Sequence, residues 1–397
     1  MPTHHHAPRS TSLATESPET KKRPSLGSRV DGLSLRVQGD PRMNPLASRR
    51  SALRTAAGAL IASSALRGFA AESTLRIGQI GTQHAHASGK MAALRGLPEI
   101  WNVIGLVEPD PARRSGVYEG LATLTEEDLL RQPDLHAVAV ETAVEASCAT
   151  AARCLKAGKH VHLDKPGALD QAEFRTMRLD AESRGLTVQM GYMLRFNPAF
   201  ALLFRAVREG WLGEITEVDA AMGKLADAKL RASLGKLPGG GMFELACHVI
   251  DATLTILGKP AKVHAFSTPT QDDGFKDNQL AVLEYPRATA TIRCNHADPF
   301  GGPRRRFSVA GTLGAMEIVP LESGKVVLSL SESRDTFRKG TQTLTLEVPK
   351  DRYQGEFRDL ASVIRGESKF AWSAAHDIAV HETVLRAAGI FNGPAGS

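Results

Sequence analysis

Residues 157–167 read Ala157-Gly158-Lys159-His160-Val161-His162-Leu163-Asp164-Lys165-Pro166-Gly167. The apolar, β-branched run His160–Leu163 follows a helical pattern and stops before a proline, which is typical of a buried strand in a parallel sheet. Asp164 and Lys165 stand at the carboxyl end of that strand, where open α/β sheets bind their ligands. The proline restricts the backbone around Lys165. We therefore interpret Lys165 as the centre of a functional site rather than a solvated cap.

The chain around this strand repeats the same alternation of strand and helix. Buried strands are predicted at residues 75–80, 102–107, 135–140, 160–163 and 186–191. Helices are predicted between them, one ending near residue 95 and the others at residues 111–118, 126–131, 145–157 and 171–183. Repeated βα units with apolar strands predict a doubly wound parallel sheet.

After residue 191 the pattern changes to strands with alternating apolar and polar residues. These strands are predicted at residues 215–222, 261–267, 279–285, 288–296, 305–310, 315–318, 325–330 and 342–348. Helices are predicted at residues 200–210, 242–257, 356–364 and 376–390. Such a pattern predicts a mostly antiparallel sheet that is open on one face and covered by helices on the other. The expected fold class is therefore α/β, with domains at residues 72–191 and 192–397.

Residues 1–71 differ in composition from the rest of the chain. They carry 11 Lys and Arg against 4 Asp and Glu, so the formal charge of +6 arises here and does not indicate nucleic-acid binding. Residues 1–42 are polar and rich in Ser, Pro and Arg, which indicates a disordered leader or an overlong start. Residues 43–71 contain Arg49-Arg50, a weakly apolar run and a small-residue cleavage pattern, and resemble a twin-arginine signal. We expect export to the periplasm and no membrane span in the mature protein.

The turn after the first strand has the position of a dinucleotide-binding loop. Gly81 matches the first glycine of the fingerprint, whereas Gln83 and His86 occupy the positions of the other two. Backbone N–H groups at the start of the following helix suit a phosphate. Glu108 closes the second strand, and a carboxylate there would bind ribose hydroxyls and repel a 2′-phosphate. We therefore interpret Glu108 as a cofactor residue that favours NAD over NADP, rather than as a surface turn acid.

Two histidine pairs, His84-x-His86 and His160-x-His162, have a spacing that allows metal chelation. No carboxylate or cysteine at an obvious spacing completes either site, so no metal is predicted, and buried, hydrogen-bonded histidines are expected instead. The four cysteines form no CxxC pair, which argues against zinc and thioredoxin-like sites and favours buried free thiols.

A third group of polar residues lies in the predicted helix 242–257. Spacings of four and three place Glu244, His248 and Asp251 on one stripe of that helix. The stripe could be solvated, but the neighbouring residues are mostly apolar. A histidine between two carboxylates on such a helix is well placed to donate and accept protons.

Several motifs in order resemble the Gfo/Idh/MocA oxidoreductase family over residues 74–391. The family signature Ala-Gly-Lys-His-Val-x-x-Glu-Lys-Pro is similar to residues 157–166, with Asp164 in the glutamate position. Its Gly-Tyr-x-x-Arg-Phe/Tyr-x-Pro segment is similar to residues 191–198. Its Gly-Gly-Gly and Asp-x-x-x-His-x-x-Asp segment is similar to residues 239–251, with Glu244 in the first aspartate position.

The resemblance implies an N-terminal Rossmann domain, a C-terminal α/β domain with an open, mostly antiparallel sheet, and a site between them. It implies an exported NAD(P)-dependent oxidoreductase that transfers hydride between nicotinamide and a carbon of a sugar, polyol or cyclitol. A neighbouring pyridinium and partial burial would lower the pKa of Lys165, which would make it usable for proton transfer.

The resemblance also assigns residues to roles. The catalytic residues would be Lys165, His248 and Glu244. A tightly bound NAD, in preference to NADP, would contact Gly81, Thr82, Gln83, His84, Glu108, Thr142, Asp164, Lys165 and Arg195. The substrate would contact Lys165, Arg195, His248 and Asp251.

Two alternatives stay open from the sequence. An NAD-dependent glycoside hydrolase or lyase would use Lys165 and His248 for a transient redox step. A cofactor-poor binding protein or pseudoenzyme of the same fold is compatible with the side chain at Gln83. The expected partners are a small-molecule substrate and further copies of the chain, which would associate through the C-terminal sheet.

Overall fold

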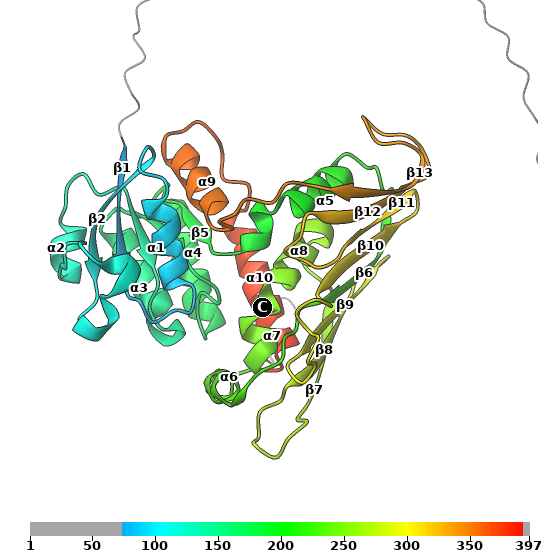
Figure 1. The fold of residues 1–397 in the computed structure, drawn as a ribbon, viewed down its shortest axis with the longest axis horizontal. Helices are drawn as coiled ribbons and strands as arrows, with labels where there is room; N and C mark the ends of the chain where they lie inside the picture. The colour runs from blue at the N-terminus through cyan, green and yellow to red at the C-terminus, as the bar shows by residue number, and fades with distance from the viewer. Residues whose placement is uncertain (1–73, 392–397) are drawn as a thin grey trace, which may run out of the picture. The chain divides into compact units, whose positions relative to one another are not determined.

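The structure, a computed structural model, describes residues 74–391, and these contain two β-sheets with their helices (Figure 1). The leader and the twin-arginine-type signal expected at residues 1–71 lie outside the described residues. None of the helices in the described part has the length and hydropathy of a membrane-crossing segment. All four cysteines are buried and unpaired, which confirms the expectation of free thiols.

The first sheet is parallel throughout, with the strand order β2-β1-β3-β4-β5. Its strands are β1 (Leu75–Ile80), β2 (Trp101–Val107), β3 (Ala137–Val140), β4 (His160–Leu163) and β5 (Val188–Met190). The order reverses between β1 and β3, and the crevice at the carboxyl ends of strands beside such a reversal is where open sheets bind ligands. The predicted doubly wound parallel sheet is confirmed.

Helices cover both faces of this sheet. One face packs against α1 (Ala87–Arg95) and α9 (Gln354–Ile364), through a core that includes Leu75, Ile77 and Phe357. The other face packs against α2 (Glu126–Leu130), α3 (Val144–Lys156) and α4 (Gln171–Ser183). Helix α9 comes from far along the chain, and a hydrogen bond of 3.1 Å from Trp101 Nε1 on β2 to the Phe357 carbonyl, 256 positions later, fixes it against the sheet.

The helix predicted at residues 111–118 is wrong. The chain forms two short 3-10 turns instead, η1 (Pro111–Arg113) and η2 (Gly116–Tyr118). Gly116 has a φ of +68°, a left-handed conformation that cannot continue a right-handed helix.

The second sheet has the order β13-β12-β11-β10-β6-β9-β8-β7, and of these pairs only β6 with β9 is parallel. Its strands are β6 (Ile215–Ala221), β7 (Lys262–Thr268), β8 (Asn278–Glu284), β9 (Thr289–Asn295), β10 (Arg306–Gly311), β11 (Gly314–Ile318), β12 (Lys325–Leu330) and β13 (Gly340–Thr345). Burial alternates along β8 and β9, so one face is covered and the other is more open. The predicted open, mostly antiparallel sheet is confirmed.

Helices α5 (Pro198–Arg208), α8 (Cys247–Leu257) and α10 (Ala374–Ala387) belong to this second part of the chain. Helix α8 packs on β6 and β9, and α10 packs on α8, on β7 and also on α4 of the first sheet. Because α10 contacts both α4 and α8, it connects the helices of the two sheets (Figure 1).

The single helix predicted at residues 242–257 is also wrong. The chain forms α7 (Gly240–Glu244), turns at Leu245 and Ala246, and continues as α8. Gly241 lies directly against the end of β9, where an added Cβ would come within 2.0 Å of His296 Nε2. This tertiary contact fixes the position of α7, so α7 does not continue straight into α8. Two short helices were not predicted, η3 (Met193–Phe196) and α6 (Ala228–Leu234).

A fully buried ion pair connects α1 to α9. The Lys90 ammonium donates to the Glu356 carboxylate, and both side chains have no exposed surface. Breaking such a pair is costly because the remaining charge keeps no counter-ion after desolvation.

We predict that Lys90→Ala lowers the free energy of unfolding by about 3–5 kcal/mol, as removal of one partner from a buried pair does. Arg131→Ala is the matched control, because Arg131 and Glu127 form an exposed pair, with 72% and 69% of their side chains accessible. Exposed pairs contribute about 0–1 kcal/mol. Urea unfolding gives the free energy of unfolding of both variants. Equal decreases in the two variants would show that the buried Lys90–Glu356 pair stabilises the protein no more than the exposed pair does.

Candidate functional site

Lys165 lies at the carboxyl end of β4 and joins the two layers of the protein. Its side chain has no exposed surface, and Nζ donates to the Glu244 carboxylate at 2.9 Å and to the Glu244 carbonyl at 2.7 Å. Glu244 is the last residue of α7, so the ion pair ties the parallel sheet to the helices of the second sheet.

The lowered pKa of Lys165 was predicted for a lysine beside a bound pyridinium, whereas the protein groups around it act in the opposite direction. Burial acts to lower the pKa of Lys165, but the Glu244 carboxylate outweighs it and raises the pKa above the usual value. Burial acts to raise the pKa of Glu244, and the Lys165 ammonium overrides it and lowers that pKa to about 2. Lys165 is therefore a charged hydrogen-bond donor near neutral pH.

His248 lies on α8, one turn beyond this ion pair. Its ring is 1% exposed and meets Tyr192 edge-on, with ring centroids 6.0 Å apart. The Nδ1 atom has no hydrogen-bond partner among residues 74–391. Burial, and then the positive charge of Lys165, lower the pKa of His248 well below its usual value. The imidazole is therefore neutral at pH 7 and can accept a proton.

The two carboxylates of the predicted stripe pair with other residues, Glu244 with Lys165 and Asp251 with Arg195, and His248 Nδ1 has no hydrogen-bond partner among the described residues. Asp251 accepts hydrogen bonds from Arg195, at 3.0 Å to Nε and 2.6 Å to Nη2. Arg195 also donates to Asp377 at 2.7 Å, and His376 lies 3.1 Å from Asp251.

Arg195 and Asp251 are consequently part of a buried network between η3, α8 and α10. Arg195 is 4% exposed and Asp251 1%, and neither lines the cavity described below. Burial acts to raise the pKa of Asp251, but the Arg195 guanidinium lowers it. The geometry gives these two residues a positioning role for α8 rather than the cofactor and substrate contacts expected from the sequence.

The turn after β1 brings Gly81, Gln83 and Glu108 together. Gly81 has a φ of +86°, and a Cβ there would come within 2.8 Å of the Thr142 Cα, so the turn lies tightly against the end of β3. Glu108 is 1% exposed, and its Oε2 accepts hydrogen bonds from Thr82 Oγ1 at 2.5 Å and from Gln83 Nε2 at 3.0 Å.

The polar groups of this turn suit the adenosine end of a dinucleotide. The Thr82 N–H is one of the donors that would face a phosphate, and at present it donates to Gln83 Oε1 at 3.1 Å. Gln83 therefore satisfies both the backbone donor and Glu108, and its side chain lines the cavity. A bound ribose and phosphate would replace the Gln83 amide at these two positions, so the residues present fit the cofactor after one side chain moves.

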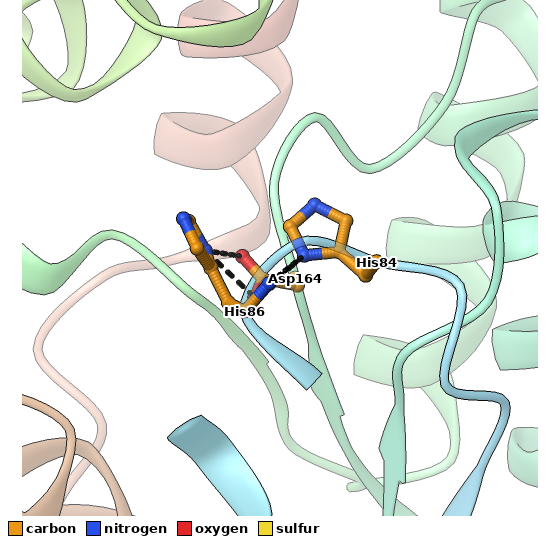
Figure 2. A group of neighbouring side chains, drawn as sticks. All are labelled: His84, His86 and Asp164. Atoms are coloured by element: carbon orange, nitrogen blue, oxygen red, sulfur yellow. Dashed lines mark hydrogen bonds and ion pairs between the residues drawn. The ribbon is translucent and has the colours of Figure 1, made fainter. Parts of the chain in front are cut away.

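His84 and His86 project from this turn toward Asp164, at the end of β4 (Figure 2). Asp164 Oδ2 lies 3.2 Å from His84 Nδ1 and 3.1 Å from His86 Nδ1. No metal was predicted at His84 and His86 because the sequence showed no third ligand near them. That reason is wrong, because the fold brings Asp164, 78 residues after His86, beside both histidines.

The other histidine pair has structural roles, as expected. His160 Nδ1 accepts the Thr187 N–H at 3.0 Å, and His162 Nδ1 lies 3.0 Å from Gln189 Oε1. Burial lowers the pKa of His162 to about 3, so this ring is neutral.

Glu141 is a buried residue of the site that sequence reasoning missed. It has no exposed surface, directly follows β3, and lies 3.7 Å from His84 Nδ1. Burial, followed by the neighbouring Asp164 carboxylate, raises the pKa of Glu141 well above its usual value. Its position at the carboxyl end of a predicted parallel strand was the signal that could have identified it.

Several of the residues described above line a cavity of about 550 Å³. That volume lies within the range of small-molecule sites in proteins. The polar side chains that line it include Gln83, His84, His86, Lys224, Glu244 and His248. Lys165 stands behind Glu244 and does not itself line the cavity.

A parallel doubly wound domain, an open-sheet domain and a polar cavity at the carboxyl edge of the first sheet define an α/β protein of the dinucleotide-binding class. Two family models match, one described as an oxidoreductase-family NAD-binding Rossmann fold over residues 75–192 and one as the GFO/IDH/MocA C-terminal domain over residues 200–317. The chain belongs to the Gfo/Idh/MocA family of oxidoreductases.

Known proteins similar to this chain include dehydrogenases. A trans-1,2-dihydrobenzene-1,2-diol dehydrogenase of Bos taurus is 29% identical over 196 residues, which cover 49% of this chain and 57% of that enzyme. The chain thus matches little more than half the length of this relative. A levoglucosan dehydrogenase, solved with NADH and levoglucosan, superposes with a TM-score of 0.70 at 17% identity, covering 80% of this chain and 97% of that one.

An oxidoreductase from Agrobacterium radiobacter, solved with NAD+, L-tartaric acid and magnesium, gives a TM-score of 0.69 at 15% identity, covering 80% of this chain and 96% of that one. At these identities the two solved structures confirm the fold.

Proposed function

We propose that the protein is an NAD-dependent oxidoreductase that acts on a hydroxyl-bearing carbon of a sugar, polyol or cyclitol. The observation that carries the proposal is the neutral His248 beside the charged Lys165–Glu244 pair, on the wall of the polar cavity. A neutral buried imidazole accepts a proton, and a fixed ammonium stabilises developing negative charge.

The residues of the site have separate roles in this reaction. Gly81, Thr82, Gln83 and Glu108 would hold the cofactor, whose nicotinamide supplies a hydride acceptor. His248 Nδ1, which has no partner in the described residues, takes the proton of the substrate hydroxyl. Lys165 keeps Glu244 in place and holds positive charge near the reacting oxygen. Asp251 and Arg195 keep α8, and therefore His248, in position.

The substrate class is supported by the cavity and by the relatives. The lining combines basic, acidic and imidazole groups with apolar ones such as Leu234 and Met222, which suits a small hydroxyl-rich molecule. A dihydrodiol dehydrogenase and a levoglucosan dehydrogenase are among the proteins that this chain resembles, and both names refer to hydroxyl-bearing rings.

We expect His248→Asn to lower kcat by about 10²–10⁴-fold, the range for loss of a general base. The same assay with His264→Asn is the control, because His264 lies on β7 with 51% of its side chain exposed. The lowered pKa keeps His248 neutral, and so active, as the pH falls below 6.5. The acidic limb of kcat/KM should therefore lie below pH 6.5. Full activity in His248→Asn would refute its role as base.

Cofactor preference gives a second test. The Glu108 carboxylate should repel the 2′-phosphate of NADP, so Glu108→Ser should weaken NAD binding and favour NADP relative to NAD. Fluorescence titration with both reduced cofactors measures the ratio. Glu145→Gln serves as the matched control, because Glu145 also lines the cavity but lies at the start of α3. An unchanged ratio of NAD to NADP affinity in Glu108→Ser would show that Glu108 does not determine cofactor preference.

We further propose that the cofactor stays bound through the catalytic cycle and that copies of the chain associate through the open face of the second sheet. Phe266, on edge strand β7, is 57% exposed and supports association there. Retention needs tight binding, and nanomolar affinity corresponds to about −12 kcal/mol. Native mass spectrometry should detect an oligomer with one dinucleotide per chain, whereas a nucleotide-free monomer would contradict both parts.

Export by the twin-arginine route would explain why a retained cofactor is needed, because a periplasmic enzyme has no free NAD pool to draw on. Arg49 and Arg50 lie outside the described residues. Replacing both with lysine should keep the precursor in the cytoplasm, as fractionation and immunoblotting would show. Unchanged export of the double variant would contradict this route.

A further inference from the structure

We propose that His84, His86 and Asp164 bind a divalent first-row transition-metal ion, with Glu141 as a second carboxylate ligand (Figure 2). This inference goes beyond the proposed oxidoreductase activity and does not depend on it. No step of the mechanism above uses the ion.

The two contacts of Asp164 with the histidines already have the spacing of a coordination sphere. Their ligand atoms all lie within 4.8 Å of one another, and Asp164 Oδ2 is 3.2 Å from His84 Nδ1 and 3.1 Å from His86 Nδ1. Ligands about 2.0–2.1 Å from a zinc ion lie roughly 3.0–3.4 Å apart in octahedral or tetrahedral geometry. The side chains therefore need little movement to bind a cation.

The hydrogen bonds of His84 indicate that its Nδ1 atom carries a lone pair. His84 Nε2 lies 3.0 Å from the Lys165 carbonyl, which can only accept, so Nε2 carries the proton. Nδ1 in turn accepts the His86 backbone N–H at 3.2 Å. This lone pair faces the Asp164 carboxylate at 3.2 Å, and a cation between the two acceptors would bind both of them.

Glu141 is a second, independent indication. Both of its carboxylate oxygens are buried and lack a hydrogen-bond partner within residues 74–391, and Oε2 lies 3.7 Å from His84 Nδ1. A buried carboxylate with no donor is costly, and a metal ion is one of the few groups that can satisfy it.

The ammonium groups of the nearby lysines donate their hydrogen bonds to other carboxylates. Lys90 is paired with Glu356, and Lys165 is paired with Glu244. Asp164 and Glu141 are therefore left as two acidic groups beside two imidazoles, which suits the charge of a divalent ion.

The ligands come from adjacent, rigid parts of the fold. The two histidines follow β1, Glu141 follows β3 and Asp164 follows β4, and these strands are neighbours in the sheet. The donor set is mixed imidazole and carboxylate, which suits Zn²⁺, Mn²⁺, Fe²⁺ or Co²⁺, whereas Ca²⁺ and Mg²⁺ prefer oxygen ligands alone.

The test uses the full chain after treatment with a chelator, without dinucleotide or substrate. His4, His5 and His6 are replaced by serine in every sample, because three adjacent histidines can bind the probe themselves. Titration calorimetry with Zn²⁺ should show one ion per chain, and Co²⁺ should give the visible absorption of a nitrogen- and oxygen-ligated site. Mg²⁺ at the same concentration should give neither signal.

Variants assign the ion to this site. His86→Gln keeps a polar side chain but removes the imidazole nitrogen, and Asp164→Asn keeps the volume but removes the charge; each should weaken Zn²⁺ binding at least tenfold. His264→Asn, with its exposed histidine, should bind as the parent does. Circular dichroism checks that each variant folds. Absence of the Co²⁺ spectrum in the parent, or equal affinity in His86→Gln and Asp164→Asn, would overturn the proposal.

Discussion

The buried ion pair between Lys165 and Glu244 is the constraint on which the rest of the site depends. Removing an ammonium and a carboxylate from water costs several kcal/mol for each ion, and only close, hydrogen-bonded geometry offsets that cost. Here Lys165 donates to both the side chain and the carbonyl of Glu244. Helix α7 must therefore end at the carboxyl edge of the parallel sheet, and Gly241 allows this by lying directly against β9.

This constraint also sets the electrostatics around the cavity. Burial, reinforced by the Lys165 ammonium, keeps the imidazole of His248 neutral. The same sheet edge carries Asp164 and Glu141. Burial acts to raise the pKa of both carboxyl groups, but His84 and Lys90 override it at Asp164 and lower that pKa. At Glu141, burial and then the Asp164 carboxylate raise the pKa. A single edge thus holds a fixed cation, a neutral base and two unequal acids.

Local periodicity was sufficient to predict most of the fold. The bounds of β1, β4, β12 and α4 coincide with those predicted, because each has a complete apolar pattern and a clear stop signal. The break between α7 and α8 was not predictable, since it depends on the contact of Gly241 with His296, which lies 55 residues further along the chain. Propensity cannot reveal a helix end that tertiary packing imposes.

As with the fold, part of the candidate site could be predicted from the sequence. Lys165, Glu244 and His248 were identified from short motifs, and the structure places them together. Arg195 and Asp251 were predicted to contact the cofactor or the substrate, but in the structure they bind each other. Asp377 and His376, both on α10, complete this network, and spacing arguments could not place α10 beside α8. The meeting of His84 with Asp164 likewise depends on strand order, which a local pattern does not contain.

Helix α9 has a consequence for how the molecule is made. The strand that begins at Leu75 is among the first described elements, yet one face of its sheet is covered by Phe357 and Leu360, close to the end of the chain. During synthesis that apolar face is covered only by α1 until α9 has left the ribosome. Contacts of such long sequence separation form slowly, because a long loop must close first. The parallel sheet is therefore completed only after α9 has been translated, well after its last strand β5.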